Sequence, residues 1–171
     1  MKALLRTRPY YNDRDMILQF KSHVLGLLEM HNGAIFHAVD SLLNTLNKVQ
    51  TTYLQALGIS EEVAFLSFNL APLQLRRDIA ILGFLHRCTL GLVHPLIRRL
   101  FKHLPHNQMQ THQVHNRQIE SHWHRISFLP EWYKRSIFAM CHVYNNLPQD
   151  LVDCGTVKEF QSWLWGVRKV G

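Results

Sequence analysis

The chain has 171 residues, of which 47% are hydrophobic, and its 19 Lys and Arg against 12 Asp and Glu give a formal charge of +7 with neutral histidines. This hydrophobic content excludes wholesale disorder, and the length suffices for one domain or for two small helical subdomains. The positive balance favours polyanions as partners, nucleic acid before acidic membrane, although net charge alone identifies no site.

The cysteines and the hydropathy pattern indicate the compartment. Cys88, Cys141 and Cys154 are an odd set without close spacing, which argues against a disulfide scaffold and fits a reducing environment. Arg6 and Arg8 interrupt the short apolar start before a signal-peptide core could form, and no stretch approaches the ~18 uninterrupted apolar residues of a membrane span. We therefore expect an intracellular protein, in the nucleus or the cytoplasm, with no membrane among its partners.

Two helices joined by a short turn are predicted at the start of the chain. Asn12 or Asp13 caps the first helix, which runs to about residue 30. Its predicted buried face comprises Met16, Phe20, Val24, Leu27 and Leu28. Residues 31–33 form the turn, and a second helix over about 34–57 ends at Gly58, with an apolar stripe of Ile35, Val39, Leu42, Leu46, Val49, Tyr53 and Leu57. Because the connection is short, the two helices are expected to lie antiparallel, as a hairpin.

A third and a fourth helix follow the hairpin. Ser60 is expected to cap the brief third helix, and the residues up to Pro72 break the chain before the fourth. The fourth helix covers residues 73 to about 91. Apolar side chains occupy most of its circumference, which predicts a central, buried element.

The second half of the chain is less regular. Residues 96–102 form a short amphipathic segment between two prolines, and residues 105–130 are a polar linker rich in His, Gln and Asn. A helix is predicted over about 131–146, and Thr156 with Glu159 forms a capping box for the last helix. No alternating strand pattern occurs. The predicted class is all-α, with a helical hairpin or bundle over 1–104, the linker over 105–130 and a smaller C-terminal helical subdomain over 131–171.

Residues 68–87, FNLAPLQLRRDIAILGFLHR, resemble a block that lies just downstream of the polymerase core in reverse transcriptases of non-LTR retrotransposons. Residues 20–38 are similar to the helices that follow the palm of these enzymes. Residues 135–160, with Asn146-Leu147-Pro148 before a final helix, are similar to their closing segment. The resemblance implies a C-terminal fragment of an RNA-directed DNA polymerase, whose first helices form a thumb that holds the template-primer duplex by its backbone.

The catalytic motif of such a polymerase is missing from this sequence. The Tyr/Phe-x-Asp-Asp turn that marks the catalytic palm is absent. Two close pairs of aspartates, Asp13/Asp15 and Asp150/Asp153, fit helix capping better than the binding of two Mg²⁺ ions. The resemblance implies Mg²⁺ for the parent polymerase, but we expect no catalytic residue, metal site or cofactor in this chain, which should be inactive alone.

Basic residues are the candidates for contact with an RNA/DNA duplex, because phosphate contact needs long cationic side chains on a rigid support. Arg76 and Arg87 are eleven residues apart, about three helical turns, and project from nearly the same face. Lys102 could extend the basic surface. The predicted nucleic-acid-binding residues are Lys21, Lys48, Arg76, Arg77, Arg87, Arg98 and Arg99. The alternative is a solvated polar face, on which Arg77 pairs locally with Asp78.

Histidines and cysteines offer two other kinds of site. Six histidines gather in one region of the sequence: His103, His106, His112, His115, His122 and His124. Their spacing matches no settled zinc geometry, so a polar loop is favoured over a zinc-stabilised domain. Cys88 and Cys141 each have a histidine nearby in sequence, but at these offsets the side chains diverge on a helix, and Cys88 is predicted to be a small core residue.

Aromatic side chains could stack on bases, but at helical spacing they more often anchor a core or an interface. The candidates are Trp123, Trp132, Tyr133, Trp163 and Trp165. Trp163 and Trp165 cannot share a helix face, so one of them should be exposed and available to the missing palm or to another protein. The alternative function is therefore a non-catalytic, all-helical protein-interaction module.

Overall fold

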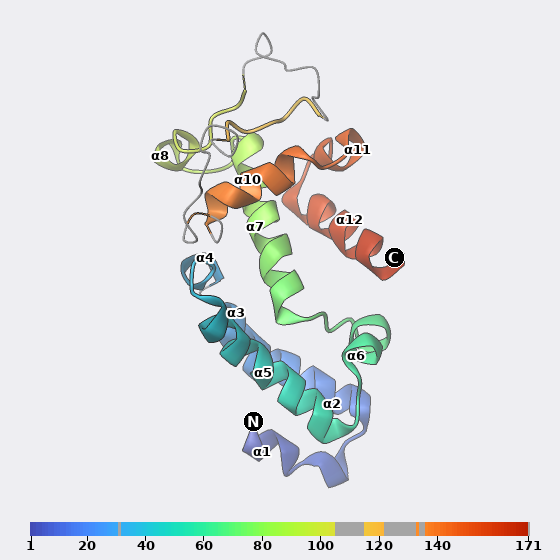
Figure 1. Cartoon of the computed structure of the whole chain (residues 1–171). Helices are drawn as coiled ribbons and strands as arrows, with labels where there is room; N and C mark the ends of the chain where they lie inside the picture. Colours follow the sequence, from blue (N-terminus) through green and yellow to red (C-terminus); the bar gives the residue numbers. More distant parts are fainter. Residues whose placement is uncertain (31, 105–114, 122–132, 134–135, 171) are drawn as a thin grey trace. The chain divides into compact units, whose positions relative to one another are not determined.

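The computed structural model describes residues 1–30, 32–104, 115–121, 133 and 136–170 (Figure 1). In these ranges the regular elements are helices, and besides them the backbones of His103 and Ile119 form an isolated antiparallel bridge. The all-α class predicted from the sequence is confirmed. None of the helices in the described ranges has both the length and the hydropathy needed to cross a membrane.

The chain divides into two compact units, unit 1 (Met1–Asp78) and unit 2 (Ile79–Gly171), each with its own apolar core. The division lies inside helix α7 (Leu73–Thr89). The sequence-based division instead follows polarity, with the linker over 105–130. Most of that linker lies outside the described residues, and the structure describes only 115–121 of it.

Unit 1 is built around the predicted hairpin. Its elements are α1 (Lys2–Leu5), η1 (Arg8–Tyr10), α2 (Asp13–Phe20), the π-helical turn η2 (Lys21–Leu25), α3 (Gly26–Glu29), α4 (Asn32–Ile35), α5 (Asp40–Leu57), α6 (Glu61–Phe68) and the start of α7. Figure 1 shows α5 running back alongside α2 and α3. The ring of Tyr53 stacks on Phe20 with centroids 4.7 Å apart, and its hydroxyl donates a hydrogen bond to the carbonyl oxygen of Met16 at 2.9 Å. These contacts hold the two arms of the hairpin together.

The π-helical turn changes which residues of the first arm are buried. A π turn contains one more residue than an α turn, so it rotates the following residues by about 100° relative to a regular helix. Leu25 is therefore buried on the same side as Phe20, whereas Leu27 is 69% exposed. The predicted buried face is right for Met16 and Phe20 and wrong for Leu27.

The second arm begins later than predicted. α5 starts at Asp40 instead of residue 34, because the preceding residues form the separate short helix α4. Val39 and Leu42, which were expected in the apolar stripe, are consequently exposed. The buried side chains of α5 are Leu43, Gln50, Tyr53, Leu54 and Leu57. Gly58 ends the helix as predicted, with a φ of 73° that glycine adopts readily.

The helix cap and the break that the sequence predicts around α6 are both present in the structure. The Ser60 hydroxyl oxygen accepts a hydrogen bond from the Val63 amide at 3.2 Å and caps α6. Asn69 ends α6 in the left-handed conformation, with a φ of 52°. Most side chains of α7 are buried or half-buried, as its apolar sequence predicts, and they supply both cores: Leu73 in unit 1 and Leu82, Leu85 and Cys88 in unit 2.

Unit 2 packs the later helices against α7 from Ile79 onward. These helices are α8 (Pro95–Arg98), α10 (Ile137–Asn145), α11 (Gln149–Val152) and α12 (Val157–Val170). In Figure 1, α10 crosses α7 and α12 runs beside it. The ring of His86 stacks on Phe160 of α12 with centroids 4.2 Å apart, and the Thr156 hydroxyl oxygen accepts a hydrogen bond from the Glu159 amide at 3.1 Å, which is the predicted cap. Most of the first turn of the helix predicted over 131–146 lies outside the described residues.

Candidate nucleic-acid interface

Two of the predicted nucleic-acid-binding residues in unit 1 make structural contacts within that unit. Lys21 Nζ donates a hydrogen bond to the carbonyl oxygen of Phe68 at 2.6 Å, where its charge complements the carboxyl end of α6. Arg76 forms an ion pair with Glu29, in which Nη2 donates to Oε2 at 3.0 Å. Lys21 and Arg76 therefore connect elements of unit 1.

Arg77 is the most deeply buried of the predicted residues, with 2% of its surface exposed. Its Nη2 donates hydrogen bonds to Asn47 Oδ1 at 2.7 Å and to Gln74 Oε1 at 2.9 Å. Burial lowers the pKa of this guanidinium, and the charge of Asp78 opposes that effect. A side chain so enclosed is badly placed to reach a phosphate outside the unit. Lys48, in contrast, is exposed on α5.

Unit 2 carries the remaining predicted residues, and these are exposed. Arg87, in the last turn of α7, donates a hydrogen bond from Nε to the carbonyl oxygen of Leu92 at 3.0 Å, which fixes the turn after the helix. Arg98 and Arg99 lie at the end of α8, and Lys102 follows them. We refer to Arg98, Arg99 and Lys102 as the basic cluster.

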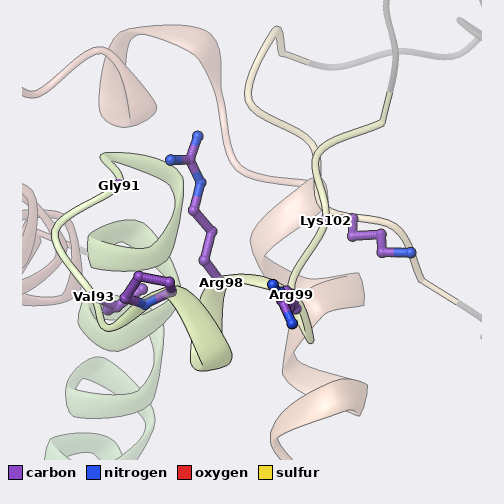
Figure 2. Close-up of a pocket in the computed structure, with 6 residues that line it drawn as sticks. Gly91, Val93, Arg98, Arg99 and Lys102 are labelled. Carbon is purple, nitrogen blue, oxygen red and sulfur yellow. The ribbon is translucent and has the colours of Figure 1, made fainter.

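A hollow of about 360 Å³ lies at the basic cluster (Figure 2). It is lined by Gly91, Val93, Pro95, Arg98, Arg99 and Lys102. The Arg98 guanidinium lies beside Gly91, since Nη1 is 3.7 Å from the place that a Cβ of residue 91 would occupy. In Figure 2 the side chains of Arg98 and Lys102 leave the backbone in different directions. The hollow thus combines apolar lining with three cations.

The residues that line the hollow include no carboxylate, although Glu120 lies next to the basic cluster, with its backbone amide donating a hydrogen bond to the carbonyl oxygen of Lys102 at 2.7 Å. Neither Asp nor Glu occurs between Asp78 and Glu120, a stretch that includes Arg87 and the whole cluster. Three cations and no carboxylate in the lining favour a positive potential, which attracts phosphate groups.

A second, smaller hollow of about 110 Å³ lies in unit 1 between α5 and the start of α7. Its lining includes Glu61, whose Oε1 accepts a hydrogen bond from the Thr51 hydroxyl at 2.7 Å. Gln50, also in the lining, is buried and donates to the carbonyl oxygen of Ala71 at 3.0 Å. With a carboxylate in its wall, this hollow is less suited to an anion than the one at the basic cluster.

Two histidines of unit 2 are buried with both ring nitrogens hydrogen-bonded. Nε2 of His86 donates to the carbonyl oxygen of Cys154 at 3.0 Å, so Nδ1 accepts from the Tyr144 hydroxyl at 2.9 Å. Nε2 of His115 donates to the carbonyl oxygen of Tyr144 at 3.0 Å, and its Nδ1 accepts from the Arg117 amide at 3.1 Å. Burial lowers the pKa of both rings. Their nitrogens are therefore committed to the fold and not to a ligand.

Of the six clustered histidines, the structure describes His103 and His115. His103 is exposed and contributes its backbone to the bridge with Ile119. The other four, His106, His112, His122 and His124, lie outside the described residues. Within the described part of the chain, no three His, Cys, Asp or Glu side chains are grouped so that they could hold a metal ion.

The three cysteines are free and buried. Burial raises the pKa of Cys88 to about 11 and that of Cys141 to about 12. Since the thiolate is the reactive form, these values disfavour a nucleophile at neutral pH. Cys88 lies in the apolar core of unit 2, as predicted.

The aromatic candidates divide between surface and core. Trp163 is 52% exposed on α12 and Trp165 is half-buried, so one of the pair is exposed, as the helical spacing predicts. Tyr133 is half-buried, and its ring stacks on Phe138 with centroids 6.5 Å apart. Trp123 and Trp132 lie outside the described residues.

Sequence reasoning missed the apolar lining of the hollow, Gly91, Val93 and Pro95. The long stretch without acidic residues was a signal that could have directed attention to this region. Gly91 followed shortly by Pro95 marks an irregular turn, but a turn in the sequence does not show whether it encloses a space.

No protein-family model matches the chain, and searches of curated proteins and of solved structures also find no match.

Proposed function

We propose that this chain is the C-terminal part of a non-LTR retrotransposon reverse transcriptase, without the catalytic palm, and that it contributes binding to template-primer nucleic acid. The resemblance of residues 68–87 to the segment after the polymerase core supports the family. The observation that carries nucleic-acid binding is the basic cluster of unit 2, in which three exposed cations line one hollow whose lining contains no carboxylate.

The chemistry of the basic cluster suits a phosphate backbone. The guanidinium groups of Arg98 and Arg99 can each donate two hydrogen bonds to one phosphate, whereas the Lys102 ammonium acts as a point charge. Each phosphate that meets a cation releases condensed counterions, so affinity falls as salt rises. Contacts of this kind position a strand without selecting its sequence.

The proposal assigns no nucleotidyl transfer to this chain. Asp13 is paired with Arg8, and Asp15 lies in the first turn of α2, where its amide donates to the capping side chain of Asn12. Both aspartates lie in the first turn of α2, where negative charge is favourable. The carboxylates that hold Mg²⁺ in the parent polymerase belong to the palm, whose Asp-Asp turn has no counterpart in this sequence.

The test is the affinity of the chain for a labelled RNA–DNA primer-template duplex, measured by fluorescence anisotropy over a salt series. The variant Arg98→Gln/Arg99→Gln/Lys102→Gln should weaken binding and lower the slope of log affinity against log salt by about 0.9 for each cation that contacts phosphate.

A matched control keeps the change in net charge and moves it away from the basic cluster. Lys2, Arg14 and Lys158 are exposed outside the cluster, and their combined substitution by Gln also removes three charges. This control should retain most of the salt slope. Absence of salt-dependent binding, or equal losses in the two triple variants, would refute the proposal.

A second candidate function is a non-catalytic protein-interaction module, which the exposed Trp163 and the exposed leucines around α8 favour: Leu92, Leu96 and Leu100. Large apolar side chains at a surface are typical of protein contacts. If this candidate holds, sedimentation will show self-association that Trp163→Ser or Leu96→Ser abolishes, and the basic cluster will be dispensable.

A further inference from the structure

The hollow at the basic cluster has a shape and a lining that a phosphate alone does not explain. Its volume of about 360 Å³ lies at the lower end of the range of small-ligand pockets, roughly 300–1,000 Å³. A double helix presents its phosphates on a wide convex surface, which can touch the rim of such a hollow but cannot enter it. One nucleotide that projects from a single strand can enter it.

The lining divides by chemistry into a part for phosphate and a part for an apolar surface. Arg98, Arg99 and Lys102 supply the charge, and Val93 and Pro95 supply the apolar side chains. A bound phosphate would leave Val93 and Pro95 facing water. The face of a base or the carbon side of a sugar would cover them, and bases are free for such contacts only where a strand is unpaired.

The wall of the hollow is held in place by the core of unit 2. Val93 and Ile97 pack against the apolar core that contains Leu85 and Phe101. Gly91 turns the chain with a φ of 73°, and the hydrogen bond from Arg87 Nε to the Leu92 carbonyl fixes the same turn. A site that is formed before binding loses little conformational entropy when a ligand enters.

We infer that this hollow accepts one nucleotide of single-stranded nucleic acid, with its phosphate at Arg98 and Arg99 and its base against Val93 and Pro95. The inference rests on the proposed nucleic-acid binding by the basic cluster and adds to it a preference for unpaired strands. It needs no metal and no covalent step.

The experiment compares three labelled probes on the full chain: a short oligothymidylate, an abasic strand with the same phosphates, and a blunt DNA duplex of the same length. The oligothymidylate should bind about tenfold more tightly than the abasic strand, because only the former carries bases. Val93→Phe fills the hollow without changing the charge. It should lower affinity for the oligothymidylate about tenfold and leave affinity for the duplex within about twofold.

Two further variants guard against an effect on folding. Pro95→Phe fills the hollow from the other apolar lining residue and should reproduce the result, and Leu92→Phe makes a comparable enlargement at an exposed neighbour that is not part of the lining. Thermal unfolding of each variant shows whether the fold is intact. Leu92→Phe should bind all three probes as the unmodified chain does.

The outcomes separate this inference from the proposed function. Equal affinity for the oligothymidylate and the abasic strand, or equal losses for single strand and duplex on filling the hollow, overturns the nucleotide site and leaves backbone binding intact. No salt-dependent binding of any probe overturns both. Competition by poly-glutamate as effective as that by the oligothymidylate also overturns the nucleotide site, because it shows a surface for polyanions in general.

Discussion

The Tyr144 hydroxyl lies 2.9 Å from Nδ1 of His86 and donates a hydrogen bond to it. The His86 ring is fully buried and stacks on Phe160. Through its carbonyl oxygen, Tyr144 also accepts a hydrogen bond from His115, the second buried histidine of unit 2. One tyrosine therefore satisfies one nitrogen of each buried imidazole.

Acidification should destabilise the chain through these two rings. Burial, followed by the charge of Arg117, lowers the pKa of His86 and His115 below the ordinary value of 6.5. The unfolded chain binds protons near pH 6.5, so stability is fully present above that pH and is lost as the pH falls toward the lower folded pKa. A difference of one in pKa corresponds to ~1.4 kcal/mol for each ring. Urea unfolding between about pH 8 and pH 5 measures the loss.

The control for the pH effect is His86→Gln, which keeps a polar side chain but cannot titrate. This variant should be less stable than the unmodified chain at the upper end of the pH range, and its stability should depend less on pH. The His86 ring faces the Tyr144 hydroxyl, whose pKa is raised to about 12 by burial and so lies far above this range, and the charge of Arg117 also acts on the ring. A urea midpoint that does not move on acidification would contradict the prediction.

Tyr144→Phe should destabilise unit 2 by about 1–3 kcal/mol, because it leaves Nδ1 of a fully buried imidazole without its donor. The matched control is Tyr10→Phe, which removes a hydroxyl from an exposed tyrosine and should change stability by less than about 0.5 kcal/mol. Urea denaturation of both variants measures the difference. Equal small effects would show that the hydroxyl does not support His86.

Arg76→Gln should lower the stability of unit 1 without changing the salt slope of nucleic-acid binding. The variant breaks a partly buried ion pair with Glu29, which we expect to cost about 1 kcal/mol. Glu29→Gln should cost a similar amount, and the double variant should cost less than the sum of the two. A reduced salt slope in Arg76→Gln would instead assign this residue to the binding surface.

Gly91→Ala should destabilise the chain by about 1–2 kcal/mol, because residue 91 has a φ of 73° and a Cβ is unfavourable in this region. Gly26→Ala is the matched control. Gly26 is in helical conformation with open space where the Cβ would lie, so alanine there should stabilise by about 0.5–1 kcal/mol. Thermal unfolding shows whether each substitution stabilises or destabilises the chain. A stabilising Gly91→Ala would mean that the turn beside the hollow adjusts easily.

Local signals explain which parts of the fold the sequence could predict. The caps at Asn12 and Ser60 and the end at Gly58 depend only on neighbouring residues, and the structure contains all three. The helical spacing of apolar residues predicts the all-α class correctly, but it also predicts that Leu27 and Val39 are buried, and both are exposed. It assumes that every helical turn is regular and that a helix starts where the apolar pattern starts, whereas tertiary packing determines both.

At the candidate site, local sequence patterns likewise do not show which charged residues have partners within the fold. Lys21 bonds to Phe68 and Arg76 to Glu29, in each case across 47 residues of sequence, so no local pattern marks these cations as structural. Arg98 and Arg99 lie in a short amphipathic segment with no acidic residue nearby, and they are exposed. A sequence shows the sign of a charge, but the fold determines whether a partner already uses it.

The π-helical turn gives the two arms of the hairpin different tolerance to the loss of one residue. Deletion of the exposed Ser22 would place Leu25 four positions after Phe20, the spacing at which a regular α-helix keeps both on one face. Deletion of the exposed Thr52 from the regular α5 would instead rotate every later side chain of that helix by about 100°. An in-frame loss of one codon is therefore compatible with the core of the first arm and incompatible with that of the second.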